Sequence, residues 1–137
     1  MPVLGLGGFF FRARDPGALR DWYREVLGVG NGCGADAEGQ THDWCWSPAP
    51  GPLVFEPFAA DSDYFKADRA YMLNLRVSEL DALLADLRAR GVSIETRAEW
   101  DDQGIGRFAR LHDPEGNPIE LWEPPTPARA DRVPQAL

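Results

Sequence analysis

The sequence predicts an α+β fold made of two tandem βαβββ units. Strand-like apolar runs and one amphipathic helical segment recur in the same order in each half of the chain. An internal repeat supports this order, because a shift of 64 residues places Leu19 on Leu83 and Glu56 on Glu120. The length of 137 residues suits one compact structural domain.

The first unit is predicted over residues 1–58. It opens with an apolar run over residues 3–13, which is typical of a buried strand. Asp15, followed by a proline, suits the N-cap of a helix. Residues 17–27 then carry apolar side chains at helical spacing, and Gly28 is placed to end the helix.

Short strands complete the first unit. Residues 41–47 alternate, with His42, Trp44 and Trp46 on one face, and residues 53–58 form another strand-like run. The glycines and prolines between these runs favour turns.

A polar, acidic connector over residues 59–68 precedes the second unit, which is predicted over residues 69–124. Its helix, over residues 79–90, carries four leucines on one stripe and is followed by a glycine. A tail rich in proline, alanine and arginine follows over residues 125–137. The strands of the second unit are expected at residues 71–77, 92–96, 106–111 and 118–123.

Composition excludes several classes of function. Twenty-two acidic and 14 basic residues leave a net charge of -8, which argues against binding to nucleic acids or to anionic membranes. The acidity suits a cationic ligand, and we expect most of it to serve solubility. No run of residues approaches the roughly 20 apolar residues that a membrane helix needs.

The cysteines indicate a cytoplasmic protein. Cys33 and Cys45 are too few for a disulfide scaffold, and their spacing fits no zinc motif. The apolar start, residues 3–11, lacks the basic region and the cleavage site of a signal peptide. We therefore expect reduced, inert thiols and a cytoplasmic location.

Motifs in both halves resemble the vicinal oxygen chelate superfamily, which contains glyoxalase I, bleomycin-resistance proteins, fosfomycin-resistance enzymes and ring-cleaving dioxygenases. Asp15-Pro16, followed by Trp-Tyr and Leu-Gly pairs within the predicted helix and at its end, is similar to the first strand–helix segment of that family. Residues 113–123, DPEGNPIELWE, resemble its final turn and strand. The resemblance covers about residues 4–124. It implies curved, half-barrel sheets around a cavity (the glyoxalase/bleomycin-resistance/dioxygenase fold) and a homodimer.

The resemblance also implies four metal-ligand positions in the metal-dependent members. Carried over residue by residue, these positions are Gly8, Glu56, Met72 and Glu120. Gly8 and Met72 offer no suitable ligand side chain to a hard or borderline divalent ion. We therefore predict no cofactor, although Glu56 and Glu120 are weak candidates for holding a divalent metal such as Mg²⁺.

Strand alternation predicts which side chains face the cavity. If Glu56 and Glu120 point inward, side chains two positions away share that face. Aromatic walls with a few polar groups are typical of small-molecule sites. The predicted ligand-binding residues are Phe10, His42, Trp44, Trp46, Phe58, Asn74 and Trp122.

Two functions follow from this cavity. The first is a binding protein similar to the bleomycin-resistance (antibiotic-resistance) branch, which holds an aromatic or cationic organic ligand. The alternative is a glyoxalase-like lyase or isomerase in which Glu56 and Glu120 serve as base or as weak metal ligands. Both glutamates are also compatible with a purely structural role. The sequence leaves open whether the protein is an enzyme.

Overall fold

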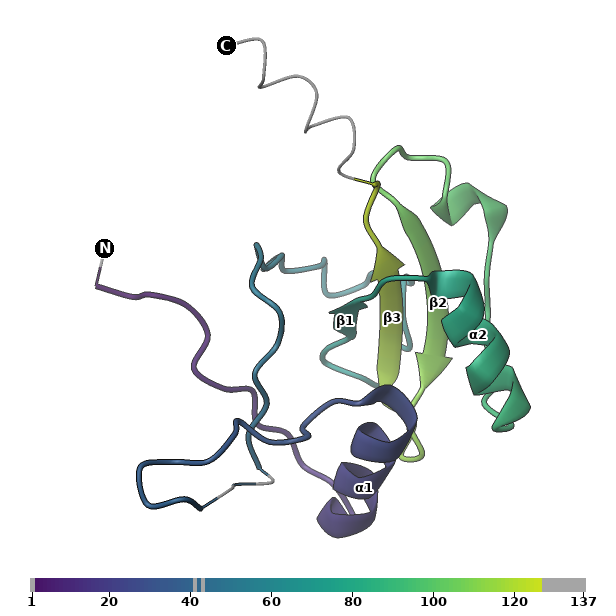
Figure 1. Ribbon diagram of the computed structural model, residues 1–137. Helices are drawn as coiled ribbons and strands as arrows, with labels where there is room; N and C mark the ends of the chain where they lie inside the picture. Colours follow the sequence, from purple (N-terminus) through teal and green to yellow (C-terminus); the bar gives the residue numbers. More distant parts are fainter. Residues whose placement is uncertain (1, 41, 43, 127–137) are drawn as a thin grey trace, which may run out of the picture. The chain divides into compact units, whose positions relative to one another are not determined.

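The computed structural model describes residues 2–40, 42 and 44–126 (Figure 1). The chain divides into two compact units, Met1–Gly51 and Pro52–Leu137. The boundaries predicted around residues 59–68 stay a prediction. Two positions of the predicted strand at 41–47, Thr41 and Asp43, lie outside the described residues, as does most of the predicted tail.

The first unit contains one helix, α1 (Pro16–Leu27), as the sequence predicts. The Asp15 side chain accepts a hydrogen bond from the Ala18 backbone N–H over 3.1 Å, which caps the helix. Gly28 ends the helix in the left-handed conformation, with φ of 69°, which costs glycine no steric strain.

The strands predicted in the first 58 residues do not form regular ladders in the described structure. Gly32 and Trp46 make one isolated parallel bridge, and no regular strand is found at residues 3–13 or 53–58. The physical reason is the lack of a neighbouring backbone, because a strand is stabilised by the hydrogen bonds of its partner. Apolar side chains of these segments are consequently left in solvent, with Leu4 96% and Phe10 93% exposed.

The second unit contains a three-stranded sheet with the order β1-β3-β2. β1 (Leu73–Arg76) pairs in parallel with the central β3 (Pro118–Glu123), and β2 (Arg107–His112) pairs with β3 in antiparallel orientation. Helix α2 (Leu80–Ala89) covers one face of this sheet (Figure 1). These elements confirm the sequence predictions at 71–77, 79–90, 106–111 and 118–123.

One predicted strand of the second unit is much shorter than expected. Residues 92–96 are reduced to a single antiparallel bridge between Glu95 and Arg110, whose backbone N–H and C=O groups exchange two hydrogen bonds of 2.8 Å. The 3₁₀ helix η1 (Ala98–Trp100) begins three residues later.

The core of the second unit lies between α2 and the sheet. Leu80, Leu84 and Leu87 are the buried residues of the helix. The sheet contributes buried side chains at alternate positions, which leaves the intervening positions on the opposite face. The buried apolar side chains of β2 and β3 are Ala109, Leu111, Ile119 and Leu121.

Within the part of the chain that the structure describes, no helix combines the length and apolar character needed to cross a membrane.

Candidate functional site

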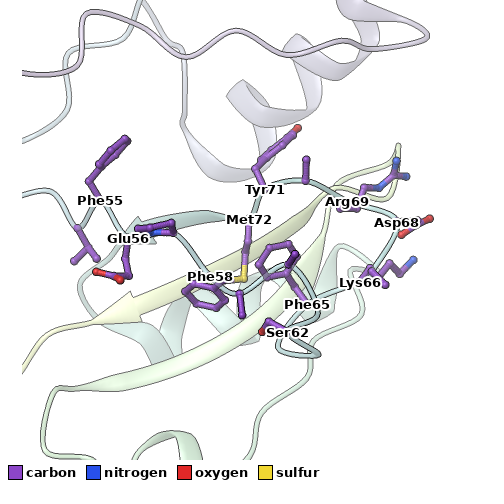
Figure 2. Close-up of a pocket in the computed structure, with 16 residues that line it drawn as sticks. Phe55, Glu56, Phe58, Ser62, Phe65, Lys66, Asp68, Arg69, Tyr71 and Met72 are labelled. Atoms are coloured by element: carbon purple, nitrogen blue, oxygen red, sulfur yellow. The ribbon is translucent and has the colours of Figure 1, made fainter.

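A cavity of about 820 Å³ lies in the second unit and is lined by residues between positions 54 and 72 (Figure 2). Its walls carry four aromatic rings, which belong to Phe55, Phe58, Phe65 and Tyr71. Two acidic and two basic side chains also line it: Glu56, Lys66, Asp68 and Arg69. An apolar wall with a few charged groups is suited to an organic molecule.

The predicted connector forms one wall of this cavity because local hydrogen bonds fold it back. The Ser62 N–H donates to the Ala59 carbonyl over 3.0 Å, and the Ser62 hydroxyl accepts from the Tyr64 N–H over 3.2 Å. These bonds place Phe58 against the aromatic pair that follows, with ring centroids 5.6 Å from Tyr64 and 5.7 Å from Phe65.

Arg69 anchors this wall to the turn before β3. Its Nη2 donates to the Glu115 carbonyl over 2.8 Å and its Nε to the Gly116 carbonyl over 3.2 Å. The turn itself is organised by Asp113, whose carboxylate accepts from the N–H groups of Glu115 and Asn117 and from the Asn117 amide. The Asp-Pro-Glu-Gly-Asn sequence is therefore a structural element that supports the cavity wall.

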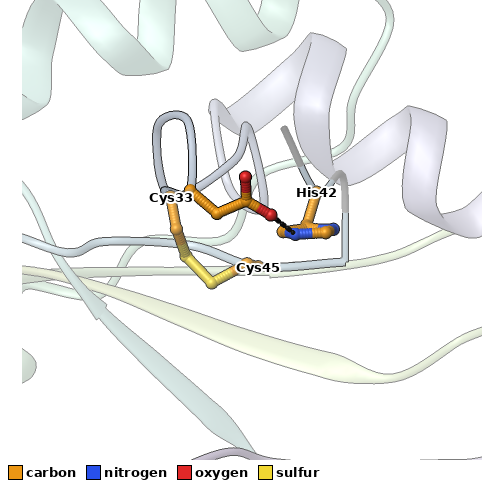
Figure 3. The surroundings of a disulfide bond; sticks show 4 residues. Cys33, His42 and Cys45 are labelled. Atoms are coloured by element: carbon orange, nitrogen blue, oxygen red, sulfur yellow. Dashed lines mark hydrogen bonds and ion pairs between the residues drawn. A yellow bond between two sulfur atoms is a disulfide. The ribbon is translucent and has the colours of Figure 1, made fainter. Parts of the chain in front are cut away.

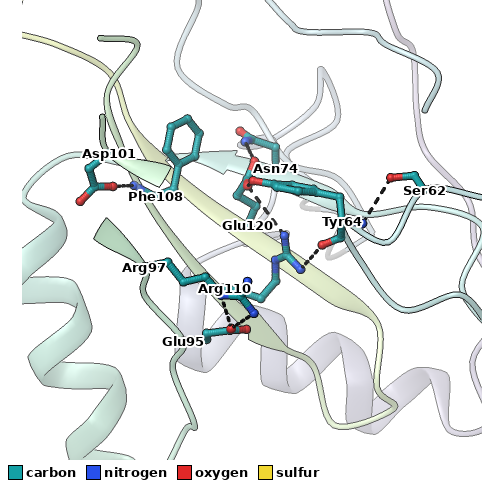
Figure 4. Close-up of polar contacts among 9 residues, drawn as sticks. All are labelled: Ser62, Tyr64, Asn74, Glu95, Arg97, Asp101, Phe108, Arg110 and Glu120. Atoms are coloured by element: carbon teal, nitrogen blue, oxygen red, sulfur yellow. Dashed lines mark hydrogen bonds and ion pairs between the residues drawn. The ribbon is translucent and has the colours of Figure 1, made fainter. Parts of the chain in front are cut away.

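A row of three polar side chains crosses the sheet on the face opposite α2 (Figure 4). Asn74 of β1 lies beside Glu120 of β3, and Arg110 of β2 lies on the other side of Glu120. The Asn74 amide donates to Glu120 Oε1 over 2.8 Å, and Arg110 Nη2 lies 3.9 Å from Glu120 Oε2. We call these residues the polar row.

Tyr64 connects the cavity wall to the polar row. Its hydroxyl donates to Glu120 Oε2 over 2.5 Å. The pKa of Tyr64 is raised to about 12, with burial as the largest cause and this hydrogen bond to Glu120 as the second. The hydroxyl is therefore a protonated donor at neutral pH, and both oxygens of Glu120 accept hydrogen bonds.

Sequence reasoning missed Tyr64, Arg110 and Phe65. Arg110 is 6% exposed, although charged residues are seldom buried. The one available signal was the adjacent Tyr-Phe pair at positions 64 and 65, which is unusual in an otherwise polar and acidic connector.

The structure brings several predicted site residues of the second unit together. Glu56, Phe58 and Met72 line the cavity, and Asn74 and Glu120 belong to the polar row. Glu56 is exposed whereas Glu120 is 7% exposed, so the repeat does not give the two glutamates the same environment.

Trp122 is two residues after Glu120 in β3 and therefore lies on the same face of the sheet. Its ring stacks on Phe108 with centroids 6.4 Å apart, and its indole N–H donates to the Ile105 carbonyl over 2.7 Å.

The remaining predicted residues belong to the first unit: Gly8, Phe10, His42, Trp44 and Trp46. Trp44 is 72% exposed, and His42 pairs with Asp36 over 3.0 Å. The hydrogen bonds from the Gln40 N–H and from His42 hold the pKa of the Asp36 carboxyl below its ordinary value. That these five residues contribute to a ligand site stays a prediction.

The expectation of reduced thiols is wrong in this structure, where Cys33 and Cys45 form a disulfide (Figure 3). The bridge between Gly32 and Trp46, together with the hydrogen bond from the Gly32 N–H to the Cys45 carbonyl, brings the two cysteines to a Cα–Cα distance of 5.4 Å. Cysteine count and spacing carry no information on this proximity.

Two of the four implied metal-ligand positions carry no suitable ligand, and a divalent metal at Glu56 and Glu120 stays a prediction. Gly8 and Met72 lack suitable ligand atoms, and Glu120 is held by Asn74 and Tyr64. Within the described part of the chain, no three His, Cys, Asp or Glu side chains come together as metal ligands would.

Comparison with known proteins identifies the family. The model of the glyoxalase-like domain matches residues 8–122. No curated protein matches the sequence. Among solved structures, the chain is similar to TnmS3, an antibiotic binding protein from Streptomyces sp. CB03234. The TM-score is 0.57, with 25% identity over 90% of this chain and 98% of that one.

Two further solved structures have lower TM-scores. A glyoxalase/bleomycin resistance protein from Streptomyces sp. CB03234 has 25% identity, a TM-score of 0.44, and coverage of 80% of this chain and 91% of that one. A glyoxalase family protein from Enterococcus faecalis has 23% identity, a TM-score of 0.44, and coverage of 80% and 89%. Because the family model spans most of the sequence, the chain belongs to the glyoxalase-like domain family, with the glyoxalase/bleomycin-resistance fold expected from its motifs.

Proposed function

We propose that this protein is a binding protein that holds an aromatic or cationic organic ligand in the cavity lined by residues 54–72. The observation that carries the proposal is the make-up of this cavity, which combines four aromatic rings with the carboxylates of Glu56 and Asp68 and the basic groups of Lys66 and Arg69. An aromatic face attracts a cation by roughly 0.5–2 kcal/mol, and a carboxylate adds a charge-assisted hydrogen bond. The volume of about 820 Å³ is within the range of small-molecule sites.

The similarity to TnmS3 supports this proposal. That protein is an antibiotic binding protein, and the two chains share 25% identity over most of their lengths. An organic ligand of comparable chemistry, which includes an antibiotic, is therefore the first class of molecule to test.

A glyoxalase-like lyase or isomerase reaction is the less supported alternative. A general base needs a carboxylate oxygen that is free to take the proton. Glu120 accepts hydrogen bonds on both oxygens and has Arg110 nearby, whereas Glu56 is exposed on the cavity wall. Glu56 is thus the better candidate base. Elemental analysis of protein purified without chelator tests this alternative, because a stoichiometric transition metal would favour it.

A titration with a panel of aromatic compounds tests the proposed function. Cationic dyes and their uncharged analogues are added to the purified protein while tryptophan fluorescence and thermal stability are recorded. Glu56→Gln should weaken the binding of the cationic compounds several-fold and leave the affinity for the uncharged ones unchanged. Glu99→Gln is the matched control, since Glu99 is exposed and does not line the cavity.

Lys66 provides a second readout at the cavity itself. It is the only lysine of the chain and lines the cavity. A bound ligand should protect it from an amine-acylating reagent, which peptide mass spectrometry distinguishes from acylation of the N-terminus. The proposal is wrong if no compound of the panel binds and none protects Lys66.

We also propose that the protein is a homodimer. The apolar side chains that the structure leaves exposed in the first unit support the dimer, since burial of Leu4 and Phe10 against a second copy would remove them from water. The Cys33–Cys45 disulfide argues against the cytoplasmic location expected from the sequence, because the cytoplasm is a reducing compartment. Light scattering coupled to size exclusion measures the oligomeric state, and a single species of 15.2 kDa would refute the dimer.

A further inference from the structure

Arg110 has hydrogen-bonding capacity that the described structure does not use. The side chain is 6% exposed, and its Nη1 donates to the Tyr64 carbonyl over 2.9 Å. Nε and Nη2 are buried and have no hydrogen-bond partner among the described residues. Glu120 Oε2 is 3.9 Å from Nη2, which balances the charge but is too long for a hydrogen bond.

The two unused donors lie on one edge of the guanidinium group. This edge presents two parallel N–H groups, which pair with the two oxygens of a carboxylate or phosphate and can also share one acceptor oxygen. Leaving buried donors unpaired costs free energy, so such groups are uncommon in native proteins and call for a partner that the described residues do not supply.

The surroundings of Arg110 indicate the chemistry of that partner. The ring centroids of Tyr64 and Trp100 lie 4.9 and 5.5 Å from the guanidinium carbon, which makes the neighbourhood aromatic. Glu120 already neutralises the positive charge, so a carboxylate ligand would be repelled by it. An uncharged carbonyl oxygen meets no such repulsion and accepts hydrogen bonds from both donors.

Tyr64 separates Arg110 from the cavity. Its ring packs on Phe58, and both Phe58 and the next residue, Phe65, line the cavity. Rotation of the Tyr64 side chain would therefore open the cavity toward the polar row, while the Tyr64 carbonyl keeps its bond to Arg110.

We propose that Arg110 is a recognition residue for an uncharged aromatic carbonyl compound, whose ring occupies the cavity and whose oxygen accepts from Nε and Nη2. This inference rests on the proposed function, because it assigns one donor group to the ligand of the same cavity.

The test compares 1-indanone with indane, its analogue without the carbonyl, in titrations of the ¹⁵N-labelled wild-type protein followed by NMR. Indanone should bind about tenfold more tightly, the ratio expected for one net hydrogen bond. An arginine Nε–H resonance should shift with indanone and not with indane. Indane-1-carboxylate should bind no better than indane, because of Glu120.

A variant pair assigns the effect to Arg110. Arg110→Met combined with Glu120→Gln removes the donors while the local charge stays balanced, and it should abolish the preference for indanone. Arg97→Met is the matched control: Arg97 also lies over the Trp100 ring, but it is exposed and paired with Glu95, so the preference should persist. The wild-type Nε–H measurement decides the question if the double variant does not fold.

The outcomes separate this inference from the proposed function. Equal binding of indanone and indane would overturn the role of Arg110, leave the cavity as a binding site, and indicate that an ordered water alone satisfies Nε and Nη2. If neither indanone nor indane binds while cationic dyes do, only the role of Arg110 is overturned. If no compound binds, both the role of Arg110 and the proposed binding function are refuted.

Discussion

The hydrogen bond between Tyr64 and Glu120 offers the most direct test of the described site. Tyr64→Phe keeps the ring against Phe58 and Arg110 and removes only the hydroxyl, which donates to Glu120 over 2.5 Å. A hydrogen bond to a charged group contributes about 1.5–3 kcal/mol net. Because Tyr64 is only partly buried and Glu120 keeps its bond from Asn74, we expect the lower part of this range. The predicted loss is about 1–2 kcal/mol of unfolding free energy at pH 7.

Urea denaturation of the wild type and Tyr64→Phe, followed by tryptophan fluorescence, measures this loss. In thermal denaturation the melting temperature should fall by roughly 3–8 °C. A double-mutant cycle with Glu120→Gln isolates the pair, and its coupling energy should be about 1 kcal/mol. A coupling energy below about 0.3 kcal/mol would refute the contact, because values of that size are expected for independent sites.

The pH dependence gives an independent check on the same contact. The folded-state pKa of Tyr64 is raised to about 12, with burial as the larger cause, whereas an unfolded tyrosine titrates near 10. A raised pKa contributes stability that is fully present below about pH 10 and is lost as the pH rises through about 12. The stability advantage of the wild type over Tyr64→Phe should therefore shrink between these values. A constant difference across this interval would contradict the raised pKa.

Three further predictions concern the scaffold. Asp113→Ala should cost about 2–4 kcal/mol in urea denaturation, because it leaves three donors of the buried turn without their acceptor, and a loss below about 1 kcal/mol would contradict that role. Leu87→Ala should lower the free energy of unfolding by about 2–5 kcal/mol. Leu83→Ala, at a less buried position of α2, should lower it clearly less. Equal losses would show that α2 packs differently. By mass spectrometry, protein purified without reductant should be two hydrogens lighter than the reduced chain. Cys33→Ser combined with Cys45→Ser should lower the free energy of unfolding in urea by about 2–3 kcal/mol. Two reactive thiols in the native protein would refute the disulfide.

The helices and the sheet of the second unit could be predicted from the sequence because their signals are local. The aspartate before α1, the proline that begins it and the glycine after it are adjacent to the ends of the helix that they define. The leucine stripe of α2 and the alternation in β3 likewise repeat over a few residues. Patterns of this kind can be recognised without knowing how the rest of the chain folds.

The strands of the first 58 residues show the limit of such signals. The apolar run at residues 3–13 has the composition of a strand, but its backbone finds no partner in the described structure and makes no ladder. Composition favours a strand, whereas pairing depends on a second segment that the run itself does not specify.

The sequence by itself determined the family, the aspartate cap of α1, the leucine stripe of α2 and the predicted placement of Glu120 and Asn74 on one face of the sheet. Only the tertiary structure decided that Tyr64 and Arg110 join Glu120, since Tyr64 in the connector is 46 residues from Arg110 and 56 residues from Glu120 in the sequence. It also decided the different environments of Glu56 and Glu120. The physical reason is that burial and side-chain pairing follow from strand register and from the segment that packs above each residue, and neither quantity is encoded in local periodicity.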